Sequence, residues 1–234
     1  MFRDTLGVTQ KFLRDKYNAT DDEISYLNDL YDFQYKKRSS IPYPQMATGH
    51  PSLVLDEFLY HGDIQHASNA KLLKELKIKH IIDVCDCELD KEILENFNVL
   101  WINLNDDFTA DIKKHFDVTN KFLYDCKQNK EKVLVHCQMG ISRSSSIVLA
   151  YLMKYHHDTL QKAYGYLLER RRVAGPNPSF LLQLIRYEKE LRATKDIDET
   201  KNNDDKQNPF EKLDVNQAAI TTVSKTETED VQME

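Results

Sequence analysis

One short segment of the sequence combines residue types that could do covalent phosphate chemistry. It begins with the apolar residues 133–135, continues into a His-Cys pair that contains Cys137, and reaches Arg143 six residues later. A loop between a strand and the first turn of a helix directs backbone N–H groups into one concavity, and the helix dipole adds positive charge there. This spacing therefore predicts an anion-binding loop with a cysteine at its base.

The residues of this loop suit the binding of a phosphate and an attack on it. The guanidinium of Arg143 can hold two phosphate oxygens at once. Gly140 allows a backbone conformation or a close approach that a side chain would obstruct. Helix N-termini and nearby cations stabilise thiolates, so Cys137 is expected to be a nucleophile. A lone cysteine is more often a small buried hydrophobic residue, but here the strand, the glycine, the arginine and an apolar helix occur together.

Alternating strands and helices are predicted to position the loop. Short apolar runs predict strands, and longer amphipathic runs between them predict helices. Such alternation is typical of an α/β fold, with a mostly parallel twisted sheet flanked by helices on both faces. The predicted strands are residues 53–55, 58–60, 79–84, 99–104 and 132–135, and the predicted helices are residues 67–76, 111–126, 144–155, 160–171 and 179–191.

Composition divides the 234 residues into three parts. Residues 51–193 form the predicted α/β domain, and residues 1–50 precede it as a partly helical extension. Residues 194–234 are polar and contain 11 acidic and 5 basic residues, so they account for the whole net charge of −6. Low hydrophobicity with net negative charge predicts that this tail is disordered.

The extension contains one clear helix signal. Thr20 and Glu23 have the spacing of a capping box, and apolar residues follow at near-helical spacing. An amphipathic helix that packs on the main domain is the favoured interpretation, ahead of a partner-binding helix. Residues 36–44 contain serines and prolines and are predicted to be a linker, in which the basic residues 36–38 are solvated charges.

Composition and charge also exclude several classes of protein. Residues 1–193 carry no net charge, which argues against a globally basic nucleic-acid binder. No apolar run approaches the length of a membrane-spanning helix, and Arg3 and Asp4 interrupt the stretch that a signal peptide would need. The four cysteines suggest a reducing compartment, the cytoplasm or the nucleus, and Cys85 and Cys87 lack the usual spacing of a zinc site.

The segment from His136 to Ser144 resembles the signature loop of the cysteine-dependent dual-specificity protein phosphatases. The resemblance extends from about Ser52 to Glu190. The loop Met-Gly-Ile-Ser-Arg-Ser, the helical Ala-Tyr-Leu-Met and the segment Pro-Asn-Pro-Ser-Phe look most like the slingshot subgroup, which dephosphorylates the actin-depolymerising protein cofilin. Residues 1–50 do not match the further domain that precedes the catalytic domain in slingshot proteins. The other matching segments are residues 58–62, 67–69 and 171–180.

The resemblance implies the family's fold, a phosphoprotein substrate, cofilin among the candidates, and no metal or organic cofactor. It makes Cys137 the nucleophile that forms a phosphocysteine, Arg143 the phosphate ligand and Ser144 the residue that stabilises the leaving thiolate. Asn177 is expected to brace the loop from the side, and His136 to order it and support the thiolate. The residues expected to bind substrate are His136, Gln138, Met139, Gly140, Ile141, Ser142 and Asn177.

The resemblance also implies a general acid on the loop before the helix that precedes the nucleophile's strand. Three aspartates lie there, namely Asp106, Asp107 and Asp111. The family's spacing between the acid and the start of the helix makes Asp106 the acid and Asp111 the helix cap, with Asp107 as the alternative acid.

Two other functions share these features. A phosphoprotein-binding module without activity would have the same loop, but Cys137, Arg143 and Asp106 are all present. A phosphoinositide or RNA 5′-phosphatase has the same fold, but its lipid-directed members carry lysine in the loop, whereas Gln138 and Met139 stand here. We therefore expect hydrolysis of phosphotyrosine and of phosphoserine or phosphothreonine. The substrate and the oligomeric state do not follow from the sequence.

Cys85 occupies the strand-end position where some relatives hold a cysteine that forms a disulfide with the nucleophile. A reversible bond between Cys85 and Cys137 is therefore a hypothesis. The alternative, which we favour, is an ordinary buried cysteine at the end of a strand.

Overall fold

The computed structural model of this chain describes residues 2–42, 49–56 and 58–204. The chain divides into two compact units, Met1–Thr194 and Lys195–Glu234. The first unit contains the whole predicted α/β domain and the N-terminal extension. In the part of the chain that the structure describes, no helix is long and apolar enough to span a membrane.

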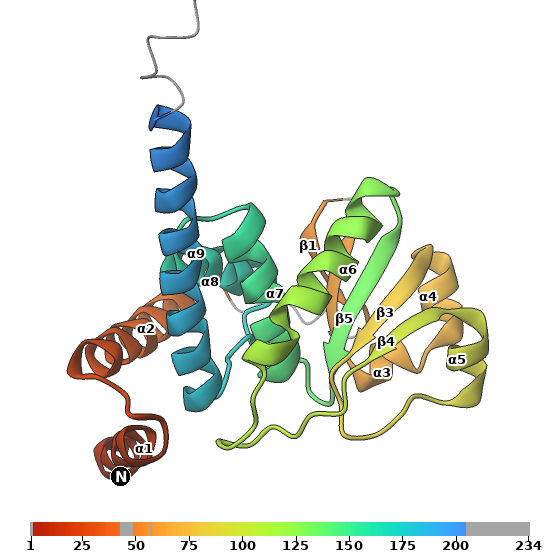
Figure 1. The fold of residues 1–234 in the computed structure, drawn as a ribbon. Coiled ribbons are helices and arrows are strands. Elements are labelled where there is room, and N and C mark those ends of the chain that lie inside the picture. Colours follow the sequence, from red (N-terminus) through yellow and green to blue (C-terminus); the bar gives the residue numbers. More distant parts are fainter. Residues whose placement is uncertain (1, 43–48, 57, 205–234) are drawn as a thin grey trace, which may run out of the picture. The chain divides into compact units, whose positions relative to one another are not determined.

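The described residues contain one five-stranded sheet. Its strands are β1 (Ser52–Leu55), β2 (Leu59–Asp63), β3 (Ile78–Asp83), β4 (Asn98–Trp101) and β5 (Lys132–Cys137) (Figure 1). Their order is β1-β2-β5-β3-β4; β1 is antiparallel to β2, and the other neighbours are parallel. The central strand β5 is apolar and fully buried over residues 133–135. This arrangement confirms the predicted α/β fold with a mostly parallel sheet.

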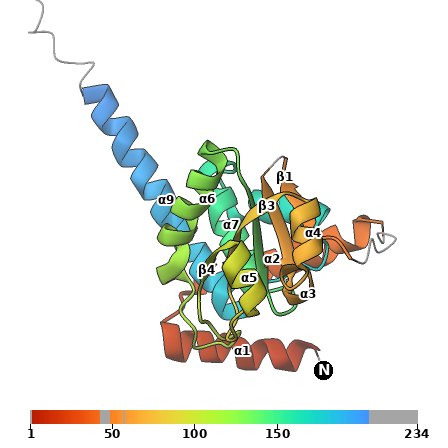
Figure 2. The same ribbon diagram turned by 90° about the vertical axis from the view of Figure 1, so that its right-hand side faces the viewer.

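Helices cover both faces of the sheet (Figure 1; Figure 2). The helices of the described residues are α1 (Phe2–Tyr17), α2 (Asp21–Ser40), α3 (Ile64–Ala67), α4 (Ala70–Glu75), α5 (Lys91–Asn96), α6 (Phe116–Gln128), α7 (Arg143–Tyr155), α8 (Leu160–Arg170) and α9 (Pro178–Asp204). Successive side chains of a strand point to opposite faces. Val133 and Val135 accordingly pack into a core with α6, α7 and α8, whereas Leu134 packs into a smaller core with α3, α4 and α5.

Several predicted elements differ in length or number from those observed. The helix predicted over residues 67–76 is two helices, because Asp63 caps α3 and Asn69 caps α4. The strand predicted to reach residue 104 ends at Trp101. The helix predicted from residue 111 begins as a 3₁₀ turn, η1 (Lys113–His115), and continues as α6. Helices α1 and α5 were not predicted.

The capping box in the N-terminal extension is confirmed. The Thr20 hydroxyl accepts a hydrogen bond from the Glu23 amide at 3.2 Å, and the Glu23 carboxylate accepts one from the Thr20 amide at 3.1 Å. Leu27 and Leu30 of the same helix are fully buried in the large core. Helix α2 is therefore part of the folded domain, as the packing interpretation predicts.

The predicted linker at residues 36–44 is wrong as far as Ser40, because α2 continues to that residue. The basic residues 36–38 were expected to be solvated, but the Arg38 guanidinium donates hydrogen bonds to the carbonyls of residues 172–174 at 2.7–3.2 Å. Lys37 forms an ion pair with Glu169. These contacts require side chains that lie about 130 residues apart in the sequence, so local patterns could not reveal them. Residues 43 and 44 of the predicted linker lie outside the described residues.

The predicted disordered tail begins as a helix in the structure. Helix α9 starts at Pro178 and runs through Asp204, beyond the boundary predicted at residue 193. Residues 194–204 contain two lysines and one glutamate but also aspartate, asparagine and threonine, which are weaker helix formers, so local propensity did not predict this continuation. Residues 205–234 lie outside the described residues, and disorder there stays a prediction.

The packing of α2 predicts that a core substitution in the extension destabilises the whole domain. Leu27→Ala removes a fully buried side chain and should lower the free energy of unfolding by about 2–5 kcal/mol. Tyr35→Ala, in the same helix at a residue with 76% exposure, is the matched control and should change it by less than about 0.5 kcal/mol. Urea unfolding of both variants tests this, and an unchanged midpoint for Leu27→Ala would show that the extension folds separately.

Candidate active site

The candidate site lies where three parallel strands end side by side. Cys137 is the last residue of β5 and pairs with Asp63 at the end of β2. His136 pairs with Asp83 at the end of β3. The carboxyl ends of parallel strands are the usual position of binding sites in open α/β sheets. The loop between Cys137 and helix α7 begins there.

Residues outside this loop donate hydrogen bonds to its backbone carbonyl groups. The Gly140 carbonyl accepts a hydrogen bond from Arg171 Nε at 2.7 Å, and the Ile141 carbonyl accepts one from the Gly175 amide at 2.8 Å. Gly140 has a positive φ of 61°, and a Cβ at this residue would overlap the carbonyl oxygen of Gly62. Because the carbonyls bond outward, the loop can turn its N–H groups inward as an anion nest.

The sulfur of Cys137 lies at the base of the loop and is almost fully buried. Its Sγ is 3.1 Å from Oγ of Ser144, in the first turn of α7. Both residues have at most 1% exposure. The N-terminal end of α7 places the positive end of the helix dipole beside the sulfur.

Arg143 is the residue that could clamp a phosphate here. Its Nη1 donates hydrogen bonds to the Leu104 carbonyl at 2.9 Å and to the Asp86 carboxylate at 3.2 Å. Its buried Nε has no hydrogen-bond partner among the described residues. A buried N–H without a partner is costly. An oxyanion bound in the loop would satisfy it.

The two candidate acids have different surroundings. Oδ1 of Asp106 accepts hydrogen bonds from Ser142 Oγ at 2.7 Å and from Asn177 Nδ2 at 2.8 Å, so this carboxylate touches the loop. Oδ1 of Asp107 instead accepts from the amide and the hydroxyl of Thr109, both at 2.7 Å, and these bonds hold the pKa of Asp107 below its usual value. The structure therefore brings Asp106, and not Asp107, to the loop.

The remaining aspartate of this segment lies apart from the loop. Oδ1 of Asp111 accepts a hydrogen bond from the Lys114 amide at 3.3 Å. That contact is at the 3₁₀ turn η1, whose N-cap position is Ile112, so Asp111 lies one residue before the cap position and bonds to an amide of the turn.

Asn177 connects the loop, the acid and the last helix. Its amide N–H donates to Ser142 Oγ at 3.0 Å, and its side-chain oxygen accepts from the Phe180 amide at 2.9 Å near the start of α9. With the bond to Asp106, this asparagine fixes three segments relative to one another. The contacts place Asn177 beside the loop, and its role as a brace stays a prediction.

The other predicted substrate-binding residues lie at the rim of the loop. Met139 has 67% exposure, and Gln138 is also exposed. The Gln138 side-chain oxygen is 4.0 Å from Sγ of Cys87. Ile141 is half-buried. These side chains can contact groups around a bound phosphate and lie outside its immediate pocket.

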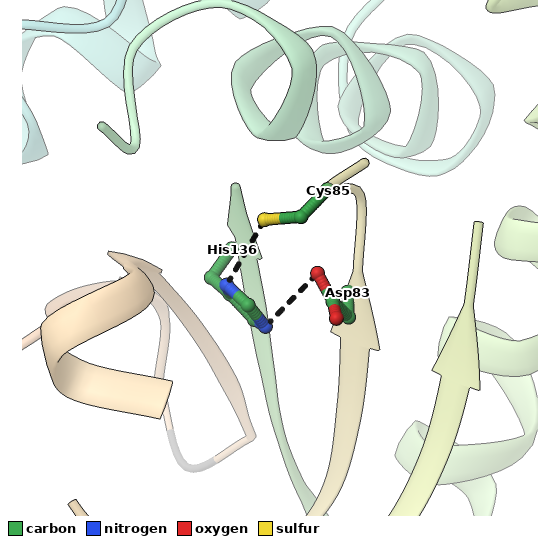
Figure 3. A group of neighbouring side chains, drawn as sticks. All are labelled: Asp83, Cys85 and His136. Carbon is green, nitrogen blue, oxygen red and sulfur yellow. Dashed lines mark hydrogen bonds and ion pairs between the residues drawn. The ribbon is translucent and has the colours of Figure 1, made fainter. Parts of the chain in front are cut away.

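His136 was expected to order the loop and support the thiolate, and the groups around its ring are the side chains of Asp83 and Cys85 and the backbone of Cys137. Nδ1 is 4.0 Å from Sγ of Cys85, and Nε2 is 3.4 Å from Oδ1 of Asp83 (Figure 3). All three side chains are buried. Burial lowers the pKa of His136 to about 4 and raises the pKa of Asp83 to about 6. At neutral pH the imidazole is therefore uncharged.

Aspartate, cysteine and histidine are zinc ligands, and one donor atom from each of Asp83, Cys85 and His136 lies within 4.8 Å of the other two. In Figure 3 the ring turns opposite nitrogens toward its two neighbours. Zinc binds one nitrogen of a histidine at about 2.0–2.1 Å and a thiolate at about 2.3 Å. The two contacts seen in the structure thus use different nitrogens of the ring and are longer than metal–ligand bonds, as in a buried polar cluster.

Cys85 and Cys137 are both free thiols in the structure. Burial and the neighbouring Asp83 raise the pKa of Cys85, so this residue is a protonated thiol at neutral pH. A disulfide between Cys85 and Cys137 stays a hypothesis, and Cys87 is exposed and outside the Cys85 cluster.

Two residues beside the loop had no role assigned from the sequence. Nε2 of His61 is 2.9 Å from Oγ of Ser144, and the guanidinium of Arg171 holds the Gly140 carbonyl. A histidine inside the buried strand β2 was a signal that could have been noticed. Arg171 lies in a run of three arginines, and the sequence does not indicate which of them turns inward.

Helix α1 and the residue at its end, Tyr17, also contact the loop that carries Asp106, which we call the acid loop. The Tyr17 hydroxyl donates a hydrogen bond to the Phe108 carbonyl at 2.5 Å, and the rings of Phe12 and Phe108 lie 5.8 Å apart. Phe108 is two residues from Asp106. Helix α1 was not predicted, and its contact with this loop is a further feature that the sequence did not reveal.

Comparisons with known proteins agree on one family. Residues 59–190 match the family described as "Dual specificity phosphatase, catalytic domain". A probable rhodanese domain-containing dual specificity protein phosphatase of Dictyostelium discoideum is 39% identical over 142 residues, which cover 61% of this chain and 30% of that protein. Protein phosphatase Slingshot homolog 1 of Homo sapiens is 39% identical over 145 residues, 62% of this chain and 14% of that protein. The matching part thus spans less than a third of each of these two relatives.

A solved structure shows the same fold. The crystal structure of a mouse putative dual specificity phosphatase complexed with zinc tungstate has a TM-score of 0.59 and 26% identity, and the match covers 67% of this chain and 97% of that one.

The buried carboxyl group of Asp83 gives a prediction about pH. Its pKa is raised from 3.8 to about 6 in the folded chain, so the folded state holds this proton more tightly than the unfolded state does. The free energy of unfolding should therefore fall as the pH rises from about 4 to about 6. Asp83→Asn removes this titration and should stabilise the chain by about 2 kcal/mol at pH 7.5, and by much less at pH 4.

Urea unfolding at the two pH values measures this difference. Asp32→Asn, at an exposed residue of α2, is the matched control and should show no such difference between the two pH values. Equal destabilisation by Asp83→Asn at both pH values would mean that the carboxylate makes favourable interactions in the folded state.

Proposed function

Because this chain belongs to the family of dual specificity phosphatase catalytic domains, we propose that it is a cysteine-dependent protein phosphatase acting on phosphotyrosine and on phosphoserine or phosphothreonine. One observation carries the proposal. A buried cysteine sulfur, an arginine with a buried N–H that has no hydrogen bond among the described residues and an aspartate bonded to Ser142 all lie on or beside the loop from Cys137 to Arg143. That combination has a nucleophile, a phosphate ligand and a proton donor.

In the first step the Cys137 thiolate attacks phosphorus. The S–P bond forms as the bond to the tyrosine, serine or threonine oxygen breaks. The loop amides and the Arg143 guanidinium hold the three equatorial oxygens and stabilise their charge. Asp106 gives a proton to the departing oxygen. Oδ1 of Asp106 already accepts two hydrogen bonds, so the proton is expected on Oδ2, which lies 3.9 Å from Arg143 Nε.

In the second step water hydrolyses the phosphocysteine. Asp106, now ionised, takes a proton from the water as its oxygen attacks phosphorus. The S–P bond breaks, the electron pair returns to the sulfur of Cys137, and inorganic phosphate leaves. The Ser144 hydroxyl lies 3.1 Å from this sulfur and can donate a hydrogen bond to the thiolate. These residues supply every proton and charge that the two steps require.

The substrate class follows from the surroundings of the loop. The loop residues 138–142 contain no lysine or arginine that would bind the further phosphates of an inositol headgroup. The exposed Met139 and Phe108 offer apolar contacts beside the pocket, which suits a peptide. Similarity to Slingshot homolog 1 makes cofilin one candidate substrate. A nucleophilic thiolate must stay reduced, and we therefore propose a reducing compartment, the cytoplasm or the nucleus.

A phosphoprotein-binding module without turnover is the competing function. The presence of Asp106 at the loop disfavours it, because binding alone needs no proton donor.

The nucleophile is tested by Cys137→Ser. A serine hydroxyl is far less ionised and less nucleophilic than the thiol, so hydrolysis of para-nitrophenyl phosphate should fall below detection while binding of vanadate is retained. Cys87→Ser, at an exposed cysteine outside the loop, is the matched control and should retain full turnover. Turnover that survives in Cys137→Ser would refute this nucleophile.

The acid is tested by comparing two neighbouring aspartates. Asp106→Asn should lower kcat about 10²–10⁴-fold for phosphotyrosine. The loss should be much smaller for para-nitrophenyl phosphate, whose leaving group needs little protonation. Asp107→Asn keeps the loop length and should change kcat less than about twofold, because that carboxylate bonds within its own loop. A larger loss in Asp107→Asn would reverse the assignment.

A further inference from the structure

A row of three buried side chains joins strand β2 to the nucleophile. His61 Nε2 lies 2.9 Å from Ser144 Oγ, which lies 3.1 Å from Cys137 Sγ. His61 and Ser144 have 0% exposure, and Cys137 has 1%. The mechanism above uses the serine and the cysteine but gives no role to the histidine.

The ring of His61 is held in its uncharged form. Burial lowers its pKa well below 6.5, and the positive charge of Arg171 adds to this effect. The titratable groups that act on it are Arg171, His136 and His66, and none of them favours the charged ring. At neutral pH the imidazole therefore carries one proton, on one of its two nitrogens.

The surroundings of the ring indicate which nitrogen carries that proton. Nδ1 of His61 is buried and has no hydrogen-bond partner among the described residues. A buried N–H without an acceptor is rarer and costlier than a buried lone pair without a donor. The proton is therefore on Nε2, and His61 donates a hydrogen bond to the oxygen of Ser144. The hydroxyl proton of Ser144 is then available for a hydrogen bond to the sulfur of Cys137.

A neighbouring serine shows what happens to a hydroxyl in this helix without such a partner. Ser146, two residues further along α7, donates its hydroxyl proton to the Ser142 carbonyl at 2.9 Å, one helical turn back. That local bond is a common alternative for serine in a helix. Ser144 is instead paired with His61 and Cys137. Ser144 lies in the first turn of α7, and the carbonyl four residues back, that of Gly140, is outside the helix and accepts from Arg171, so the partners of its hydroxyl come from strands β2 and β5.

We propose that His61 is a positioning residue that aims the Ser144 hydroxyl at the sulfur of Cys137. The inference rests on the proposed function and deepens it. The aimed hydroxyl stabilises the thiolate before attack. It does so again in the second step, when the S–P bond breaks and the electron pair returns to sulfur. His61 transfers no proton in either step, and its hydrogen bond only fixes the direction of the serine O–H.

The first experiment measures the reactivity of the sulfur without any substrate. The full chain and the variants His61→Gln and His61→Met are alkylated with iodoacetamide from pH 5 to pH 9, and labelling of each cysteine is followed by peptide mass spectrometry. Glutamine and methionine have similar length, but only glutamine has an N–H to donate near the position of Nε2. The exposed Cys87 is the internal control in every sample.

We expect His61→Met to slow alkylation of Cys137 about tenfold at low pH and to move the midpoint of the pH profile upward by about one unit, since a hydrogen bond to a charged group is being weakened. His61→Gln should stay within about threefold of the unmodified chain, and labelling of Cys87 should not change. Identical Cys137 profiles for the two variants would overturn the proposal. Because these variants have nearly the same side-chain volume, a general loss of packing would affect them equally.

The second experiment tests whether His61 acts through Ser144. Ser144→Ala should slow hydrolysis of the phosphocysteine, so that para-nitrophenyl phosphate gives a burst of para-nitrophenolate equal to the enzyme concentration. His61→Met should give a similar burst with a smaller loss of steady-state rate. The double variant should behave like Ser144→Ala alone. Multiplicative losses in the double variant would show that His61 does not act through the serine.

Different results would contradict the proposed phosphatase function and the proposed role of His61. If the unmodified chain showed no turnover of any phosphoester, the proposed function would fail, while the alkylation profiles would still test the hydrogen bond. If turnover were normal and the profile of His61→Met were unchanged, only the role of His61 would fail.

Discussion

The close approach of Gly140 to the backbone of Gly62 is the constraint on which the candidate site depends. A Cβ at Gly140 would overlap the Gly62 carbonyl and the Arg171 guanidinium, so the loop can lie against the end of β2 only because this side chain is missing. Arg171 then fixes the Gly140 carbonyl at 2.7 Å. With its carbonyls bound outward, the loop can present N–H groups to an anion. The same approach places the end of β2, and thus His61, behind the sulfur of Cys137.

The loop is also connected to segments that are distant in the sequence. Asn177 bonds to Ser142 and Asp106, so the start of α9, the loop and the acid form one hydrogen-bonded unit. Helix α1 contacts Phe108 in the acid loop, and Arg38 of α2 binds the carbonyls just before Gly175. The N-terminal helices therefore stabilise two of the segments that border the candidate site, although they are outside the matched residues 59–190.

The sequence predicted those parts of the fold that depend on local patterns. Apolar runs identified all five described strands, and the loop from Cys137 to Arg143 was recognised because its residue types and spacing are specific. Asp106 and Asp107 are adjacent and chemically identical, so only the direction of the folded loop, set by partners such as Asn177, distinguishes their surroundings. The contacts of His61 and of α1 also depend on distant partners, with sequence separations of 83 and 91 residues. No local period or motif encodes such contacts.

The buried histidines of the candidate site differ from the partly exposed Asp106 in their role in proton transfer. His61 and His136 lie beneath the loop, and burial lowers the pKa of both below the physiological range. Such rings keep a fixed number of protons, which suits them to hold a hydroxyl or a strand in place and makes them poor proton carriers. The side chain of Asp106 has 33% exposure at the mouth of the loop. In the proposed mechanism this carboxyl group is the one that transfers protons, whereas the buried histidines have no proton-transfer step and are assigned only hydrogen-bonding roles.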